Sequence, residues 1–593
     1  MKNFLLKKFA CLLLIFLSCC ITASAQYYIR GQITDEKDRP IFNVRIHLHS
    51  TNGFYYSGSS GAFGIPSSHA FDSLTLTVEG YEEKIMRINT SGYQQIKMKP
   101  LSSNSTVQKQ RLQSFTKDLP LNQNGKWDAG DETYSSLIEN FPIETTKYPS
   151  TSFALNIDGA SYSNIRRFIT METIVPPGAV RIEEMLNYFR LNYHPPGEGK
   201  TFGIQSQLTD CPWNAKKKLL FLNISSKKLP LENLPPANLV LLIDISGSME
   251  LPNKLPLLKQ AYRKLIENLR DVDTVSVCVY GGVTGVLLNP TGGAEKNKIM
   301  AVIDSLQPAG STPGANALRS AYTLAGNIFK KDGNNRIILA TDGDFNVGET
   351  EDKDLEELIA LNKNSGVYLT CLGVGTGNLK DSKLVALAKK GNGNYAYIDN
   401  LEEAEKVLVK EFTQNLYAVA EDVNLDVKFA ADAIKNYRLI GFDNKAGVIA
   451  DTSIKLEGRE IGPAHAVTAM FEIEPTDSLI KDELLADINL RYHLPACEEI
   501  TEDSFTVNNN YKEFLLTDYS YQFASSVALF GMILRHSPYA MNKTTEDVIP
   551  IAAASYDKTD RWQQEFINIL NKAAKLYAKK KPVKNFWKKK KLA

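Results

Sequence analysis

Five side chains carry oxygen atoms at positions where together they could bind a metal ion. They are Asp244, Ser246, Ser248, Thr312 and Asp342. The first three alternate in the sequence Asp-Ile-Ser-Gly-Ser, a spacing that can place one carboxylate and two hydroxyls on the same side of a tight turn. A hard dication such as Mg²⁺ prefers near-octahedral oxygen ligands at about 2.0–2.1 Å, with few carboxylates and several waters. The pattern therefore predicts a divalent-cation site, with Mg²⁺ as the best fit and Mn²⁺ or Ca²⁺ as alternatives.

Three of these residues also have an ordinary structural explanation. Ser246 and Ser248 could cap the helix that follows them, and Asp342 could close a turn. The metal-site interpretation is favoured because all five residues fall in order on loops that follow or separate the expected strands.

The segment 237–420 alternates between apolar strand patterns and amphipathic helix patterns. An apolar run at 239–244 is typical of a buried strand, and a helix face follows it at three- and four-residue spacing. That face consists of Leu255, Leu258, Tyr262, Leu265 and Leu269. The alternation predicts a doubly wound, Rossmann-like α/β domain with a mostly parallel sheet. Ligands of such folds bind at the carboxyl ends of the strands, where the sequence places Asp244 and Asp342.

The D-x-S-x-S motif, the mid-domain Thr312 and the later Asp342 resemble the metal site of the von Willebrand factor A family. The resemblance implies that Ser246, Ser248 and Thr312 bind the ion directly, while Asp244 and Asp342 act through waters and hydrogen bonds. It also implies one open coordination position, which a carboxylate from a protein partner would fill. So few protein charges would leave the ion electrophilic.

Motifs on both sides of this domain resemble the YfbK-type bacterial von Willebrand factor A proteins over roughly residues 133–570. The motifs include Cys211-Pro212-Trp213-Asn214, Tyr437-Arg438-Leu439-Ile440-Gly441-Phe442 and Phe530-Gly531-Met532. The strand and helix patterns divide this region into an N-terminal extension at 133–236, the metal-site domain at 237–420, a β-rich domain at 421–512 and a C-terminal helical segment at 513–578, with helix patterns near 517–535 and 560–578. The resemblance implies a family without a known reaction.

The β patterns at 195–236 and 421–512 are expected to form one sandwich, with the α/β domain inserted between them. Each flank alone has too few strands to bury a sheet face. An inserted domain is tolerated where its two ends lie close together at the surface. This arrangement would bring Cys211 and Cys497 into one domain and leaves a disulfide between them open.

The first 25 residues have the features of a secretory signal peptide. Basic residues precede an apolar run at 9–17, and Ala23-Ser24-Ala25 forms a small-x-small cleavage site. A lipoprotein anchored at Cys19 or Cys20 is the alternative. The sequence thus predicts an exported protein of the periplasm or cell surface. Later segments lack 18 uninterrupted apolar residues, so we expect no membrane-spanning helix in the mature chain.

Short strand patterns separated by turns fill residues 26–100 and predict an N-terminal β-sandwich. Gly31-x-Ile33-x-Asp35 and Gly61-x-Phe63-x-Ile65 resemble the carboxypeptidase regulatory-like domain of exported bacterial proteins. Residues 101–132 are rich in Ser, Gln, Asn and Lys and are expected to be a linker.

The net charge of +1 combines an acidic body with a Lys-rich end of the chain, including a basic tail at 579–593. This tail could contact anionic lipid or polysaccharide at the envelope surface, or remain solvated. Nucleic acid is not an expected partner of an exported protein.

Several features argue against catalysis. All seven histidines lie outside 237–420, which excludes a Ser-His-Asp triad within that domain. The glycines Gly373, Gly375 and Gly377 resemble a dinucleotide loop, but their spacing does not match that motif. We therefore expect a non-enzymatic binding module, with a structural scaffold as the rival function.

Overall fold

The computed structural model describes residues 27–99, 112–113 and 132–578, with interruptions of which the longest are 344–357 and 443–459. The expected signal peptide, most of the expected linker, Thr312 and the basic tail at 579–593 lie outside the described residues. The chain divides into two compact units, Met1–Gln108 and Lys109–Ala593, each of which is described by itself.

The first unit contains two small sheets around one apolar core. The sheets have the strand orders β4-β1-β7 and β3-β2-β5-β6. Their strands are β1 (Tyr27–Thr34), β2 (Arg45–Leu48), β3 (Gly53–Tyr56), β4 (Ala62–Ser67), β5 (Phe71–Thr77), β6 (Lys84–Asn89) and β7 (Tyr93–Lys97). Alternate side chains point to opposite faces of a strand, so Ile29 and Ile33 of β1 join Leu74 and Leu76 of β5 in the core.

A six-stranded sheet of order β15-β14-β13-β16-β17-β18 forms the centre of the α/β domain in the second unit. Its strands are β13 (Ala237–Asp244), β14 (Thr274–Tyr280), β15 (Gly285–Gly292), β16 (Asn334–Thr341), β17 (Val367–Val374) and β18 (Asn392–Ile398). Neighbouring strands are parallel except for β15, which pairs with β14 in the antiparallel direction. The predicted doubly wound, mostly parallel α/β fold is confirmed.

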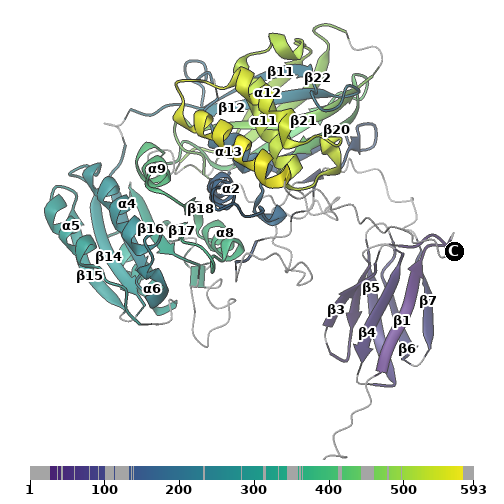
Figure 1. Ribbon diagram of the computed structural model, residues 1–593, viewed down its shortest axis with the longest axis horizontal. Helices are drawn as coiled ribbons and strands as arrows, with labels where there is room; N and C mark the ends of the chain where they lie inside the picture. Colours follow the sequence, from purple (N-terminus) through teal and green to yellow (C-terminus); the bar gives the residue numbers. More distant parts are fainter. Residues whose placement is uncertain are drawn as a thin grey trace, which may run out of the picture. The chain divides into compact units, whose positions relative to one another are not determined.

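Helices cover both faces of this sheet, as a buried parallel sheet requires (Figure 1). On one face, Leu239 and Leu241 of β13 pack in a cluster with residues of α4 (Leu255–Glu267) and α5 (Lys296–Ser305). On the other face, Val240 and Leu242 pack with residues of α6 (Ala315–Asn327) and α8 (Asp381–Lys390). The two clusters come from alternate residues of the same strand.

Two five-stranded sheets lie beside the α/β domain in the same unit. Their orders are β23-β22-β19-β10-β8 and β11-β12-β21-β20-β9. The strands are β8 (Leu112–Gln113), β9 (Ile143–Glu144), β10 (Ser150–Ala154), β11 (Phe202–Asp210), β12 (Lys218–Ser226), β19 (Glu421–Phe429), β20 (Ile434–Ile440), β21 (Ala466–Pro475), β22 (Leu484–His493) and β23 (Ile500–Asn508).

Strands from before and after the α/β domain pair directly with one another. β12 runs antiparallel to β21, from Lys218 opposite Ile473 to Ser225 opposite Ala466. Alternate residues of both sheets, such as Leu222 and Leu425, share one apolar cluster. The two sheets therefore bury a common core.

A layer of helices covers the outer face of the sheet that contains β12 and β21 (Figure 1). It consists of α2 (Ala160–Thr170), α3 (Ile182–Tyr188), α11 (Tyr519–Leu534), α12 (Thr545–Ser555) and α13 (Arg561–Ala578). The sequence patterns near 517–535 and 560–578 anticipated α11 and α13. They did not anticipate α12, which contains Pro550, a residue that normally argues against a helix interior.

The structure gives no disulfide between Cys211 and Cys497. Both thiols are free, Cys211 buried and Cys497 exposed, and the Cys211 sulfur lies 3.8 Å from a carboxylate oxygen of Glu472. In the described part of the chain, no helix combines the length and the apolar character needed to cross a membrane.

Candidate functional site

The carboxyl ends of three neighbouring parallel strands bring the first site residues together. Register places Asp244 at the end of β13 opposite Tyr280 of β14, and Ile243 opposite Ala340 of β16. The hydroxyls of Tyr280 and Thr341 both donate to Asp244 Oδ2, at 3.1 and 2.9 Å. The Asp244 carboxylate is thus fixed by side chains from both adjacent strands.

The turn after β13 places its two serines side by side. The backbone N–H of Ser246 donates to Asp244 Oδ1 at 2.8 Å, and the hydroxyls of Ser246 and Ser248 form a hydrogen bond with each other at 3.1 Å. Ser246 precedes the short 3-10 helix Gly247–Glu250, but its side chain makes no capping hydrogen bond. The alternative explanation of Ser246 as a helix cap therefore does not apply.

The spacing of these hydroxyls suits an octahedral ion. Two ligands at about 2.1 Å in adjacent octahedral positions are about 3.0 Å apart, close to the observed 3.1 Å. In the described part of the chain, no three His, Cys, Asp or Glu side chains form a metal cluster. A donor set of serine hydroxyls with two carboxylates fits a hard dication such as Mg²⁺ better than zinc.

Asp342, directly after β16, is held by groups from three other segments. Lys254 Nζ lies 2.9 Å from Asp342 Oδ2 and 3.0 Å from Asn378 Oδ1. Burial acts to raise the pKa of Asp342, but hydrogen bonds from Ser248, Asn378 and Lys254 outweigh it and keep the pKa below its usual value. This carboxylate is therefore ionised over a wide pH range.

The pKa of Asp244 is shifted in the opposite direction, above its usual value. Burial raises its pKa, and the nearby charge of Asp342 adds to this effect. Both carboxylates are fully buried, whereas Ser246 is half-buried and Ser248 is exposed. The two serines thus lie at the surface of the domain, whereas the ends of the sheet enclose the two carboxylates.

Thr312 lies outside the described residues, but the loop that leads to it is anchored at the site. Ala309 N–H donates to the carbonyl oxygen of Ile245 at 2.7 Å, and Gly247 N–H donates to that of Gly310 at 3.0 Å. These two bonds place residue 310 next to the serine turn. The role of Thr312 as a ligand stays a prediction.

Four residues of the site were not predicted from the sequence: Tyr280, Thr341, Lys254 and Asn378. Thr341 could have been noticed because it directly precedes Asp342. No local signal marks Lys254, since a lysine next to a helix start is usually solvated. Its burial follows only from the tertiary contacts of its side chain with Asp342, Gly375 and Asn378.

The structure also explains why a glycine occupies position 375. Gly375 has a φ of +78°, and a Cβ at this position would lie 2.3 Å from Cε of Lys254. The aliphatic chain of Lys254 therefore passes directly over Gly375. This close approach accounts for Gly375 without a nucleotide.

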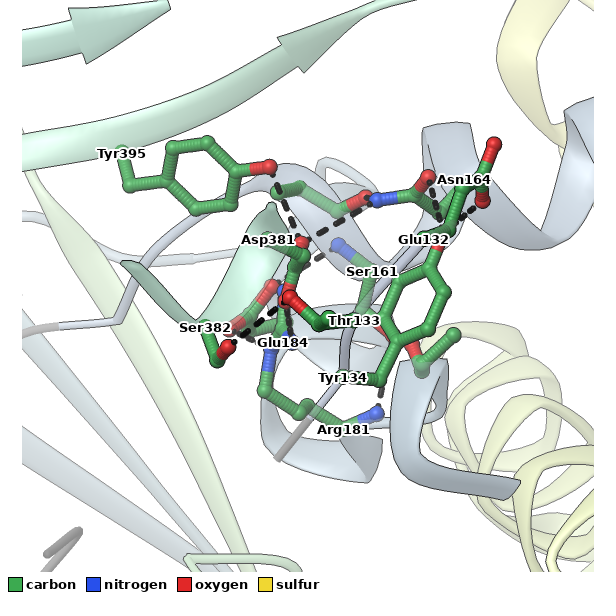
Figure 2. A network of polar contacts seen from close by, with 12 residues as sticks. Glu132, Thr133, Tyr134, Ser161, Asn164, Arg181, Glu184, Asp381, Ser382 and Tyr395 are labelled. Atoms are coloured by element: carbon green, nitrogen blue, oxygen red, sulfur yellow. Dashed lines mark hydrogen bonds and ion pairs between the residues drawn. The ribbon is translucent and has the colours of Figure 1, made fainter. Parts of the chain in front are cut away.

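The same loop continues into a buried polar network with the N-terminal extension (Figure 2). Gly377 N–H donates to Glu132 Oε1 at 2.7 Å, and Glu132 accepts two hydrogen bonds from Arg167 at 2.7 and 2.8 Å. Asp381 accepts from Arg181 Nη1 at 2.8 Å and from the Tyr395 hydroxyl at 2.9 Å. The loop that contacts Lys254 is thus fixed at its far end to α2 and α3.

Three stretches of the chain match known families. Residues 128–221 match a family described as von Willebrand factor, residues 238–413 the von Willebrand factor type A domain, and residues 414–576 the C-terminal region of the uncharacterized protein YfbK. Over 474 residues the chain is 33% identical to the uncharacterized protein YfbK of Escherichia coli (strain K12), which covers 75% of this chain and 81% of that protein. The chain belongs to the YfbK family of von Willebrand factor type A proteins.

Two further similar proteins cover a smaller part of this YfbK-family chain and have a lower sequence identity than the Escherichia coli protein. Inter-alpha-trypsin inhibitor heavy chain H2 of Mesocricetus auratus is 30% identical over 154 residues, which is 24% of this chain and 16% of that protein. A solved structure of von Willebrand factor type A from Catenulispora acidiphila shares 14% identity with a TM-score of 0.39, over 63% of this chain and 89% of that one. The family assignment rests on the Escherichia coli relative.

Proposed function

We propose that this YfbK-family chain is an exported, metal-dependent protein-binding module, with a role in adhesion or assembly rather than catalysis. In this proposal, Asp244, Ser246, Ser248, Thr312 and Asp342 hold a divalent cation, with Mg²⁺ as the best fit. When bound, the cation would supply an electrophilic centre that captures an acidic group of a protein partner. The von Willebrand factor type A domain family commonly mediates protein–protein interaction, which supports a binding role.

One observation carries the proposal. The Ser246 and Ser248 hydroxyls are adjacent at 3.1 Å, and the two buried carboxylates lie at the ends of neighbouring strands beside them. Serine hydroxyls used only for capping would point to backbone N–H groups, yet Ser246 makes no such bond. A divalent cation gives these four side chains a common partner.

The rival proposal is a structural scaffold, in which the cation only ties the strand-end loops together. The hydrogen bonds from Tyr280 and Thr341 to Asp244 support it, since they already link three strands. A scaffold would gain stability from metal without capturing a partner.

The first experiment measures Mn²⁺ binding to the full chain through the loss of the free-ion signal in electron paramagnetic resonance. Wild type should bind Mn²⁺ saturably, and the double variant Ser246→Ala/Ser248→Ala should bind at least about tenfold more weakly. Ser305→Ala, which removes an exposed hydroxyl of α5, is the matched control. Wild-type protein that binds no Mn²⁺ would refute both the binding module and the metal-tied scaffold.

The second experiment separates the two proposals by capture from an envelope extract with Mg²⁺ or with chelator. A partner whose capture requires both Mg²⁺ and the two serines supports the binding module. Metal binding without such capture supports the scaffold. Asp244→Asn is a further variant for both experiments. It is preferable to Asp244→Ala, because alanine would leave the buried Tyr280 and Thr341 hydroxyls without their acceptor.

Export also belongs to the proposal. The basic start, the apolar run and Ala23-Ser24-Ala25 support cleavage before Gln26 and a periplasmic or surface location. A diacylglyceryl group on Cys19 or Cys20 in the intact mass would indicate the lipoprotein alternative. The basic tail would then add an envelope contact through its lysines.

The proposed architecture has the α/β domain inserted into the sandwich formed by both flanks. Pairing of β12 with β21 and their shared apolar cluster support it. The two sheets of the first unit, packed around one core, support the N-terminal β-sandwich and its proposed carboxypeptidase regulatory-like nature.

A further inference from the structure

Lys254 is a buried cation in contact with the candidate metal site. Its side chain is 4% exposed, and its Nζ atom lies 2.9 Å from Asp342 Oδ2, whose side chain is fully buried. Asn378 Oδ1 accepts a second hydrogen bond at 3.0 Å. The ammonium is therefore held inside the protein by groups of the site and its adjoining loop.

The path of the side chain fixes the ammonium in this position. The stem of Lys254 passes over Gly375, where an added Cβ would lie 2.3 Å from Cε and 2.6 Å from Cγ. The backbone carbonyl of Lys254 accepts from Leu258 N–H at 2.9 Å in the first turn of α4. With its stem enclosed and its backbone tied to a helix, Lys254 has little freedom to leave Asp342.

Lys254 and the proposed ligand Ser248 act on the same carboxylate. Both donate hydrogen bonds to Asp342, so a cation held through Ser248 and Asp342 would have the ammonium as a close neighbour. Two positive charges that contact the same carboxylate repel each other, and this repulsion is stronger where water is excluded. A neutral hydrogen-bond donor in place of Lys254 would orient Asp342 without this repulsion.

We infer that Lys254 is a positioning residue that sets the charge of the metal-loaded site, weakening the metal but strengthening capture of a partner's carboxylate. The two aspartates and a dication sum to zero, and Lys254 raises the sum over these groups to +1. A carboxylate then enters a positive site rather than a neutral one. This inference rests on the proposed function, since it concerns the same cation site.

The test compares Lys254→Met with Lys254→Arg in the full chain. Methionine keeps most of the stem volume and removes the charge, whereas arginine keeps the charge. Mn²⁺ is the metal probe and acetate is the carboxylate probe. Relaxation of water protons reports both, because bound Mn²⁺ enhances the relaxation and acetate lowers it when it replaces a water on the ion.

Lys254→Met should bind Mn²⁺ about tenfold more tightly than wild type, and the Mn²⁺-loaded variant should bind acetate several-fold more weakly. Lys254→Arg should stay within about threefold of wild type in both measurements. A purely structural lysine would instead lose Mn²⁺ affinity on substitution. Unchanged or weaker Mn²⁺ binding by a folded Lys254→Met overturns the inference, as does acetate binding equal to that of wild type. Absence of Mn²⁺ binding by wild type would refute the proposed function itself and is thus distinguishable.

Discussion

Arg181 and Asp381 are 200 positions apart in the sequence, yet Arg181 Nη1 lies 2.8 Å from Asp381 Oδ2. Both side chains are buried, and Glu184 accepts a further hydrogen bond from the same guanidinium. The pair joins the residue before α3 to the first residue of α8 (Figure 2). It therefore fixes the α/β domain against the extension that precedes it.

Replacement of Arg181 by methionine should destabilise the protein by about 3–5 kcal/mol, because it leaves Asp381 and Glu184 buried without their cation. Denaturant unfolding of the full chain measures the change. Arg263→Met is the matched control: its ion pair with Asp304 is exposed, and its loss should cost less than about 1 kcal/mol. Equal losses for both variants would contradict this account of the interface.

Gly375→Ala should destabilise the protein by about 2–3 kcal/mol for two reasons. The new methyl group must displace the Lys254 stem, and the alanine backbone must adopt a positive φ. Gly377→Ala separates the two effects. Gly377 also has a positive φ, of +93°, but an added Cβ there meets no atom within 4 Å. It should cost only about 1 kcal/mol in urea unfolding, and a Gly375→Ala loss no larger than this would show that Lys254 is free to move.

Phe566→Ala should cost about 3–5 kcal/mol, since it empties the centre of the helical layer. The Phe566 ring lies 5.4 Å from the rings of Phe189 and Phe523 and 5.8 Å from that of Phe530, between centroids. Phe329→Ala serves as control because Phe329 is 42% exposed. Chemical denaturation of both variants tests whether α13 is held by this cluster, and a loss below about 1 kcal/mol for Phe566→Ala would exclude it.

His465 should make the protein acid-sensitive. Burial lowers the pKa of His465 from its usual 6.5 to about 4, and its Nε2 atom has no hydrogen-bond partner among the described residues. As the pH falls, His465 is therefore protonated in the unfolded chain before it is protonated in the folded protein. The stability that neutral His465 provides is full above about pH 6.5 and falls as the pH drops toward 4, by up to about 3 kcal/mol.

The pH dependence is measured as a difference between variants. The unfolding free energy of wild type minus that of His465→Asn should decrease from pH 7.5 to pH 4.5. His194→Asn, at an exposed histidine, is the matched control. A flat difference for His465→Asn would mean that the imidazole is hydrated in the folded protein.

The sequence by itself predicted the α/β domain and its family. Buried parallel strands must be apolar throughout, and helices that cover them must be amphipathic. The apolar run at 239–244 and the helix face from Leu255 to Leu269 are such local patterns, and they were enough to predict the fold. The D-x-S-x-S spacing is local too, which is why Asp244, Ser246 and Ser248 could be proposed together. α12 was missed because Pro550 opposes the local helix pattern, and tertiary packing outweighs it.

The tertiary structure decided what surrounds the candidate site. Lys254, Tyr280, Thr341 and Asn378 come from different segments, and their contacts with Asp244 and Asp342 depend on strand register and on the path of the 375–380 loop. Burial of both carboxylates has the same origin, because solvent exclusion is a property of the assembled sheet ends. A single sequence specifies which oxygen atoms are available, but the charge balance around them depends on which distant side chains the fold brings within hydrogen-bonding distance.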